Sequence, residues 1–275
     1  MKIKNDFSSI LESYFSKHLK LERKFSINTY DTYLTVLKQF INYLSDELKI
    51  KRHELSLYDF NKKNIMTFLD YVERSLKCSS KTRNHKLTII NSFLEYAQSI
   101  NPVYIDLYLS SKSIKMKKVP KKKMDFMTVE EMKAFFKCID LRYRSGYKHY
   151  IMLTVLYETG ARVSELINME VSDIFFNKDP YIKIAGKGNR ERLVYINDSV
   201  VSMIKEYMKK FKIKSSFLFL NHSNEKFTRY GVNKIVNKYY EKAKKKCPTL
   251  NNKTITPHTF RHSKAVHFLQ NRTAL

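Results

Sequence analysis

A lysine-rich stretch near the middle of the chain separates two parts of different pattern. The segment 110–123, SSKSIKMKKVPKKK, holds seven lysines, one proline and no acidic residue. Its apolar residues show little periodicity, and such a composition is typical of an extended linker. At 275 residues the chain is long enough for two separate cores. We therefore predict a domain over 1–109, a basic linker over 110–123 and a second domain over 124–275.

The first domain has apolar residues at helical spacing. Four stretches follow this pattern: FSSILESYFSKHL, SINTYDTYLTVLKQFINYLSDEL, DFNKKNIMTFLDYVERSL and SSKTRNHKLTIINSFLEYAQSI. In the second stretch, apolar residues recur every three or four positions, which predicts one buried helix face. That face comprises Ile27, Tyr30, Leu34, Leu37, Ile41 and Leu44. We expect a helical bundle.

The second domain is expected to be helical with a short β insertion. Thr128 and Glu131 have the spacing of a capping box, and Gly160 follows an apolar helix at a position that favours a left-handed residue. The stretch PYIKIAGKGNRERLVYIN alternates like two strands around a turn at 186–189. Pro257 suits the beginning of the last helix. The predicted fold class is mainly α with a small β-hairpin or sheet.

The net charge points to a polyanionic partner. It is formally +26, while 43% of the residues are hydrophobic, so the chain is a folded basic protein. Nucleic acid is the commonest partner of such a protein. A composition rich in lysine and asparagine can also raise the isoelectric point without any function. The linker and the second domain carry most of the charge, so DNA or RNA could be bound from two sides with the linker crossing its backbone.

The fourth predicted helix begins with a cap at Ser79 or Ser80 and a cluster of cations. Cations at a helix N-terminus oppose the helix dipole, so a negative group is expected to compensate them. A DNA phosphate would do so, and a solvated basic face is the alternative. Our predicted contacts with the DNA backbone come from this helix and the linker: Lys81, Thr82, Arg83, Lys86, Lys117, Lys118, Lys121 and Lys122.

Cysteine usage and hydropathy exclude several classes of protein. Cys78, Cys138 and Cys247 are far apart and odd in number, without the spacing of a zinc site. They are interpreted as free thiols in a reducing compartment. No run approaches the length of a membrane span, and the first residues do not have the pattern of a signal peptide. We expect a cytoplasmic protein with no metal, no cofactor and no membrane partner.

Three separated segments hold the candidate site: TGARVSEL at 159–166, AGKGNRERLVYI at 185–196 and PHTFRHS at 257–263. Each is ambiguous alone. Arg162 could be a solvated arginine at a helix start, Lys187 a hairpin tip, and His258 a surface or satisfied core residue. His258 and Arg261 are three residues apart, which places them on one helix face.

In this order the segments resemble the tyrosine recombinase, or phage integrase, family. That family carries an arginine in T-G-x-R-x-S-E-L, a lysine in G-K-G-x-x-x-R, and H-x-x-R-H preceded by proline. The first half of the chain also resembles the family's helical core-binding domain. The resemblance implies a site-specific recombinase of a mobile element, Xer-like or of transposon type. Such enzymes work as a tetramer on two double-stranded DNA sites, through a 3′-phosphotyrosyl intermediate.

The resemblance also assigns roles to the candidate residues. Arg162 and Arg261 would be guanidinium forks that stabilise the charge developing on the nonbridging oxygens of the phosphate, without metal. Lys187 would protonate the departing sugar oxygen as general acid. His258 would bond a nonbridging oxygen or assist proton movement. Two residues would support these groups: Glu165 by orienting its neighbours, and His262 in a structural role.

The family's nucleophile has no counterpart in these residues. Its tyrosine follows H-x-x-R-H and an L-G-H segment, whereas all 19 tyrosines here precede His258. Tyr239 and Tyr240 are expected to pack. We therefore expect DNA binding without cleavage. We favour a shortened form of an active recombinase, because HFLQNRTAL continues in a helical pattern. The alternative is a non-catalytic DNA-binding competitor or regulator, and an RNA-binding protein is disfavoured by the lack of an aromatic sheet motif.

Overall fold

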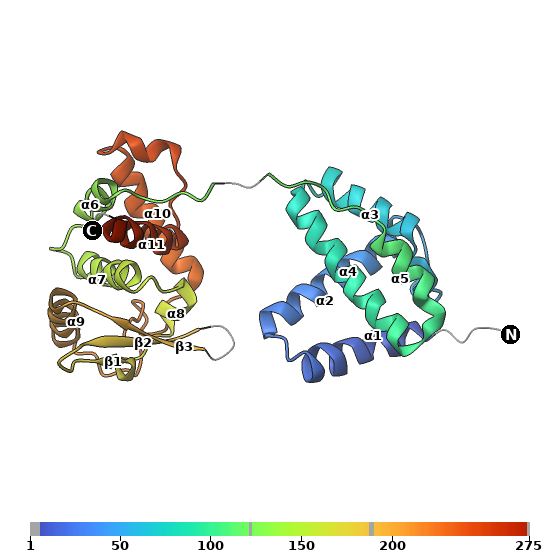
Figure 1. The fold of residues 1–275 in the computed structure, drawn as a ribbon, viewed down its shortest axis with the longest axis horizontal. Helices are drawn as coiled ribbons and strands as arrows, with labels where there is room; N and C mark the ends of the chain where they lie inside the picture. The colour runs from blue at the N-terminus through green and yellow to red at the C-terminus, as the bar shows by residue number, and fades with distance from the viewer. Residues whose placement is uncertain (1–5, 121–122, 187–189, 274–275) are drawn as a thin grey trace. The chain divides into compact units, whose positions relative to one another are not determined.

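The computed structural model of the chain describes residues 6–120, 123–186 and 190–273. The chain forms two compact units, Met1–Lys121 and Lys122–Leu275, and Figure 1 colours it from blue at the N-terminus to red at the C-terminus. None of the helices in the described ranges is long and apolar enough to cross a membrane.

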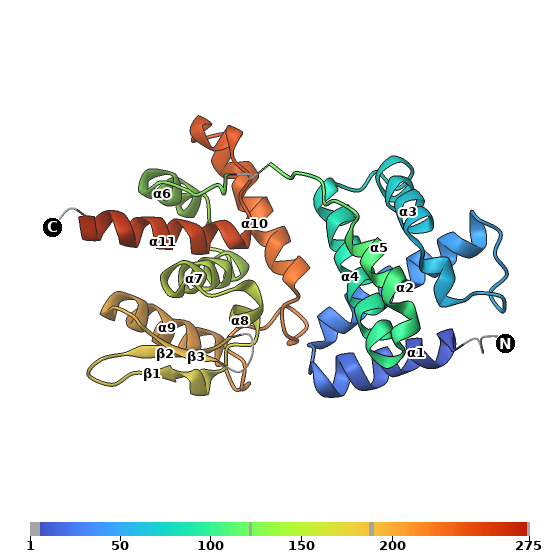
Figure 2. The ribbon, with the colours of Figure 1, turned by 45° about the vertical axis from the view of Figure 1, so that its right-hand side comes forward.

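The first unit is a bundle of helices around α4. Its helices are α1 (Phe7–Ser13), a π-helical continuation of it (Tyr14–Glu22), α2 (Ile27–Asp46), α3 (Lys62–Arg74), α4 (Ser80–Ile100) and α5 (Ile105–Lys112). Figures 1 and 2 show α4 in the middle of the unit, where it contacts α1, α2, α3 and α5. Ser79 caps α4 by accepting a hydrogen bond from the backbone N–H of Thr82, which agrees with the sequence prediction.

The buried face of α2 differs in part from the predicted face. Leu37 and Leu44 are buried, but Ile27 is 69% exposed at the beginning of the helix. Phe40, which the pattern left out, is fully buried against the rings of Phe60 and Phe68, at centroid distances of 4.8 and 5.0 Å. Packing against aromatic rings from other parts of the bundle therefore selects which face of α2 is buried, and that face differs in part from the predicted one.

The segment predicted as an extended linker starts later than expected. Helix α5 runs through Lys112, and Ile114 is buried in the core of the first unit. Asn84 on α4 donates its Nδ2 to the carbonyl of Lys117 at 2.8 Å and accepts the Lys117 N–H at 3.0 Å. The prediction of a linker from residue 110 was therefore wrong for its first part, which packs on the first unit through contacts with a helix about 30 residues earlier.

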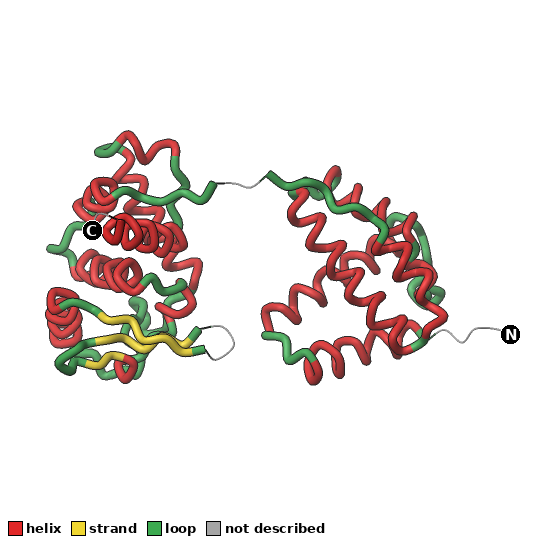
Figure 3. Tube along the Cα trace, in the orientation of Figure 1, coloured by secondary structure: helices red, strands yellow, loops and turns green. Residues whose placement is uncertain are grey.

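The second unit combines helices with one antiparallel sheet. Its elements are α6 (Val129–Lys137), α7 (Arg144–Thr159), α8 (Val163–Ile167), β1 (Ile174–Phe175), β2 (Tyr181–Ala185), β3 (Glu191–Tyr195), α9 (Asp198–Phe211), α10 (Arg229–Lys244) and α11 (Pro257–Thr273). The strand order is β1-β2-β3, and the register pairs Ile182 with Val194 and Ala185 with Glu191. Figure 3 shows the strands in yellow among red helices. The predicted fold class is confirmed.

Helix α7 forms the centre of the second unit. It lies between α11 on one side and α9 on the other, as Figures 1 and 2 show. Ile151, Met152, Leu153, Val155 and Leu156 are buried along it. Because apolar residues cover most of its circumference, α7 is a core helix rather than a surface helix. Its C-terminal end, beside the beginning of α11, holds the first candidate residues.

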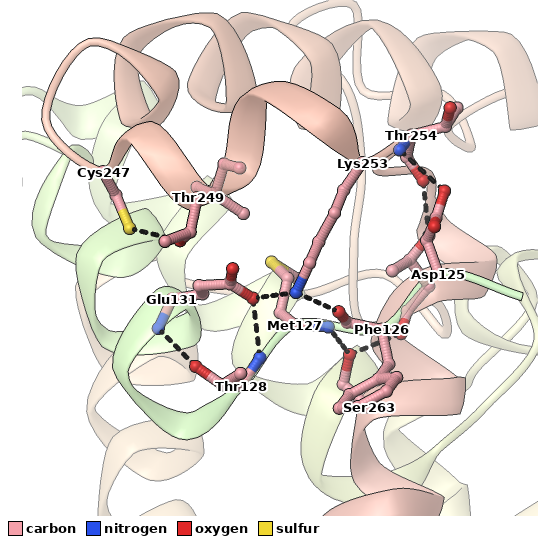
Figure 4. A network of polar contacts seen from close by, with 12 residues as sticks. Asp125, Phe126, Met127, Thr128, Glu131, Cys247, Thr249, Lys253, Thr254 and Ser263 are labelled. Carbon is pink, nitrogen blue, oxygen red and sulfur yellow. Dashed lines mark hydrogen bonds and ion pairs between the residues drawn. The ribbon is translucent and has the colours of Figure 1, made fainter.

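A polar network fixes the beginning of the second unit (Figure 4). The N–H of Met127 donates to Ser263 Oγ on α11 at 2.8 Å. Lys253 Nζ donates to the carbonyl of Phe126 at 2.9 Å and to the buried carboxylate of Glu131 at 2.5 Å. Glu131 also completes the predicted capping box with Thr128. Residues just after the linker are thereby bonded to the helix that carries H-x-x-R-H.

Candidate active site

A left-handed glycine sets the position of Arg162. Gly160 ends α7 with φ of +56°, a conformation that other residues adopt only at a cost. The chain then extends through Arg162, which is the N-cap residue of α8. Its backbone N–H donates to Glu165 Oε2 at 2.8 Å, and its side-chain Nη1 donates to Oε1 at 2.8 Å. The T-G-x-R-x-S-E-L motif is therefore a helix stop followed by a capped helix start.

Arg192 on β3 is a member of this cluster that the sequence reasoning missed. Its Nη2 donates to Glu165 Oε2 at 2.6 Å and its Nη1 to Oε1 at 3.3 Å. A Cβ on Gly186, at the end of β2, would lie 3.7 Å from both Glu165 Oε1 and Arg192 Nη1. The signal was present, since Arg192 is the last position of G-K-G-x-x-x-R.

Glu165 is ionised at any physiological pH. Its side chain is 5% exposed, and burial alone would raise its pKa. The hydrogen bonds from Arg192 and from the backbone and side chain of Arg162 outweigh that effect and lower the pKa of Glu165 to about 2. A fixed negative charge therefore lies between the two guanidinium groups.

Arg261 joins the cluster from the first turns of α11. Its Nη1 donates to the carbonyl of Gly160 at 2.6 Å, and one turn later Lys264 pairs with Glu158 at 2.6 Å. Phe260 is fully buried, with its ring 5.2 Å from that of Phe135. This packing fixes the rotation of α11, so that Arg261 lies beside the C-terminal end of α7.

The cations of the cluster repel one another. The pKa of Arg261 is lowered first by burial and then by Arg162 and Arg192. Burial also lowers the pKa of His258, and the charges of His262, Arg261 and Arg162 lower it further. These effects favour the neutral form of His258, in which one ring nitrogen accepts and one donates. Its ring lies edge-on to that of His262, with centroids 5.4 Å apart.

The arrangement suits an anion rather than a cation. Arg162 and Arg192 bond the carboxylate of Glu165, and Arg261 lies near enough to interact electrostatically with all three, so the cluster keeps an excess of positive charge. Over the described ranges no group of three or more His, Cys, Asp or Glu side chains could hold a metal ion. Lys187, the predicted general acid, lies outside the described residues. The strands on either side of it are joined at their ends by the N–H of Gly186, which donates to the carbonyl of Arg190 at 2.8 Å.

Two of the predicted DNA contacts on α4 are buried in the first unit. Arg83 and Lys86 are each 6% exposed. Arg83 Nη1 donates to the carbonyl of Lys115 at 3.1 Å, and Lys86 Nζ donates to Gln39 Oε1. Both side chains therefore bond other parts of the bundle, and burial lowers the pKa of Lys86.

The other predicted contacts divide into exposed residues and residues outside the described ranges. Lys81 and Thr82 are exposed on the first turn of α4. Lys117 and Lys118 are also exposed, and Lys117 pairs with Glu73 at 2.5 Å. Lys121 and Lys122 lie outside the described residues.

Comparison with known proteins identifies the family. The phage integrase family matches residues 125–275, and the N-terminal SAM-like domain of phage integrases matches residues 12–100. Tyrosine recombinase XerD of Staphylococcus epidermidis is 31% identical over 281 aligned positions, which cover 96% of this chain and 86% of that protein. Tyrosine recombinase XerC of Staphylococcus haemolyticus is 31% identical over 263 positions, 93% of this chain and 82% of that protein.

Solved structures share the fold. The XerH site-specific recombinase bound to a palindromic difH substrate has a TM-score of 0.70 at 20% identity, covering 99% of this chain and 80% of that one. The Tn1549 transposon integrase in complex with transposon right end DNA has a TM-score of 0.71 at 17% identity, covering 94% and 86%. The motifs, the two matched domains and these relatives agree, and the chain belongs to the phage integrase family of tyrosine recombinases.

Proposed function

We propose that the chain is a site-specific DNA recombinase of a mobile element, which binds double-stranded DNA and holds one phosphate between Arg162 and Arg261. The observation that carries the proposal is the cluster in which Arg162 and Arg192 bond Glu165 while Arg261 interacts electrostatically with all three. Guanidinium forks match the oxygens of a phosphate, and they stabilise charge best when they are positioned in advance.

The proposed chemistry is an in-line displacement at phosphorus. A tyrosine hydroxyl attacks the phosphodiester, the bond to the 5′ oxygen breaks, and a 3′-phosphotyrosyl bond forms. Arg162 and Arg261 stabilise the negative charge that grows on the nonbridging oxygens. Lys187 protonates the 5′ oxygen as it leaves, and His258 bonds a nonbridging oxygen or takes up the proton that the tyrosine hydroxyl loses. Rejoining reverses these steps. Because the forks supply the positive charge, the reaction requires no metal ion and no cofactor.

In this proposal the nucleophile is not among these 275 residues. All 19 tyrosines precede His258 in the sequence, whereas the family's tyrosine follows the H-x-x-R-H motif. Tyr239 and Tyr240, the last two, are 3% and 9% exposed, and their hydroxyls bond His149 and the carbonyl of Leu250. They pack in the core, as the sequence suggested. These residues then hold a phosphate without attacking it.

The assembly and the cellular location complete the proposal. A lambda integrase tetramer bound to a Holliday junction shares the fold, with a TM-score of 0.69 at 15% identity, over 94% of this chain and 71% of that one. By analogy, the recombinase acts as a tetramer on two DNA sites, in the cytoplasm. The second candidate function is a non-catalytic DNA-binding competitor or regulator.

A nicked duplex that traps covalent intermediates tests the proposal. The binding site is first selected from a random duplex library with the 275-residue chain. We expect this chain to bind the site without forming a covalent band. A form extended through the family's tyrosine should form the band, and Arg162→Ala or Arg261→Ala in that form should abolish it. Most DNA affinity should remain, because many lysines share the backbone contacts.

Three results would count against these assignments. A covalent band from the 275-residue chain would show that it holds its own nucleophile. Unchanged cleavage by the extended Arg162→Ala variant would remove Arg162 from the site. Failure of the extended form to form any band, with DNA binding intact, would favour the non-catalytic regulator.

A further inference from the structure

The position of Glu165 presents an electrostatic problem for an anion-binding site. Its carboxylate is 5% exposed and bonded to Arg162, the residue that the proposed function assigns to the phosphate. Two negative charges a few ångströms apart repel each other strongly where water is excluded. A carboxylate also matches the guanidinium fork of Arg162 as well as a phosphate does, so the two anions compete for it.

Arg192 is placed to remove both conflicts. It contacts both oxygens of Glu165 through two guanidinium nitrogens, at 2.6 and 3.3 Å. Arg162 uses only Nη1 of its guanidinium on Glu165, among the bonds within the described ranges, and its side chain is 49% exposed. Arg192 thus satisfies the carboxylate from the sheet side and leaves the remaining donors of Arg162 available.

Charge counting leads to the same conclusion. Arg162, Arg192 and Arg261 with Glu165 sum to two positive charges, and removal of Arg192 would leave one. The freed carboxylate would then bond Arg162 alone. We propose that Arg192 is a positioning residue, which neutralises Glu165 so that Arg162 is free to bind the reacting phosphate. This inference rests on the proposed function.

The proposed role differs from a merely structural one in what would restore it. If Arg192 only fixes β3, then a change at Glu165 cannot compensate for its loss. If Arg192 neutralises Glu165, then Glu165→Gln removes the competing charge and restores phosphate binding in the Arg192→Ala background. Lys183 offers a matched control, because it pairs with Glu191 at 3.2 Å on the same two strands.

Methylphosphonate scanning of the selected duplex measures how much each single phosphate contributes to DNA affinity. Each substitution replaces one charged nonbridging oxygen by a methyl group, and affinity is measured with the 275-residue chain. The reacting phosphate is the position where substitution weakens binding by wild type but not by Arg162→Ala. We expect a loss of about tenfold to hundredfold there for wild type, the usual range for hydrogen bonds to a charged group.

The variants then separate the two roles. In the Arg192→Ala variant, methylphosphonate substitution at that position should lower DNA affinity by about threefold or less. The reason is that Arg162 is then bonded to Glu165 rather than to the phosphate. In the double variant Arg192→Ala with Glu165→Gln, the same substitution should again lower affinity by about tenfold or more. In Lys183→Ala the loss of affinity should equal that of wild type. Arg192→Lys keeps the charge but not the fork, so a loss between these values is expected. Arg192→Lys replaces Arg192→Ala in the comparison if Arg192→Ala does not fold, which thermal unfolding would detect.

The outcomes distinguish failure of this inference from failure of the proposed function. If no position depends on Arg162, the proposed function fails and this inference falls with it. If such a position exists and Arg192→Ala, or Arg192→Lys in its place, keeps the full wild-type loss, then only this inference is overturned. It is also overturned if the double variant stays as weak as Arg192→Ala.

Discussion

At the scale of single residues, the site depends most on Glu165. Its carboxylate accepts from the backbone and side chain of Arg162 and from two nitrogens of Arg192, and only 5% of its side chain is exposed. It therefore caps α8, orients Arg162 and joins the sheet to the helices. Removing the carboxylate would leave two guanidinium groups without their partner, which is more costly than the loss of a surface ion pair.

We predict that Glu165→Gln destabilises the chain in a pH-dependent way. The folded pKa of Glu165, about 2, is below its ordinary value of 4.5. A lowered pKa stabilises the fold above the unfolded value and loses that effect as the pH falls toward the folded value. The variant should lose about 2–3 kcal/mol at pH 7. Urea unfolding of both chains should show this difference shrinking below pH 4.5, and a constant difference would contradict the ion-pair origin.

The sequence predicted some of these residues and missed others for a physical reason. Short motifs pointed to Arg162, Glu165, His258 and Arg261, because each motif is a local device, a helix stop, a cap or a helix face, and the structure brings them into one cluster. Arg192 stands at the last position of the hairpin motif, but its contact with Glu165, 27 residues away, is not visible in that motif. The burial of Lys86 and Arg83 was missed for the same reason. Lys86 bonds Gln39 and Arg83 bonds Lys115, so their burial depends on residues that are distant in the sequence.

At the scale of elements, the site is the junction between the end of α7 and the beginning of α11. The carbonyl of Gly160 accepts Arg261 Nη1 at 2.6 Å, and the same glycine turns the chain toward Arg162. Local chemistry predicted the two helix ends that meet here, since Gly160 stops one helix and Pro257 begins the other, but it did not predict their meeting. It did not predict the core-facing side of α2, because buried aromatic rings from other helices select that side.

We predict that Gly160→Ala lowers the free energy of unfolding by about 1 kcal/mol, the usual cost of a left-handed residue with a side chain. Apart from its two chain neighbours, no described residue has a heavy atom within 4 Å of the position that its Cβ would occupy, so the cost is backbone strain without a steric clash. Gly160→Asn is the control and should cost less, because asparagine adopts this conformation more readily. Equal losses in urea unfolding would contradict the role assigned to the left-handed backbone.

At the scale of the whole molecule, the connection between the units is shorter than the basic stretch suggested. Asn84 holds Lys117 on the first unit, while Phe126 and Met127 are bonded to Lys253 and Ser263 in the second. Residues 118–125 lie between these two hydrogen-bonded segments. A formal charge of +26 is distributed on both sides of this connection.

We predict that Asn84→Ala frees the beginning of the linker and exposes it to trypsin. Lys115, Lys117 and Lys118 lie there, and loss of both hydrogen bonds from Asn84 lowers the free energy needed to open the segment. Cleavage after these lysines should be about tenfold faster, as expected for the loss of about 1.4 kcal/mol of local stability. Asn64→Ala is the control, because the hydrogen bonds that Asn64 donates among the described residues join it to Asp59 and Asn61 of the same unit. Equal cleavage rates for the two variants would contradict the anchor.

Salt dependence will show which lysines meet DNA phosphates. Each phosphate contact releases counterions, and its loss reduces the slope of log affinity against log salt by about 1. Lys81 is exposed on the first turn of α4, whereas Lys86, five residues later, is 6% exposed and donates to Gln39. Lys81→Ala should therefore reduce the slope, and Lys86→Ala should leave the slope unchanged while lowering the melting temperature. A reduced slope for Lys86→Ala would mean that α4 exposes this lysine when DNA binds, and an unchanged slope for Lys81→Ala would remove it from the DNA-binding surface.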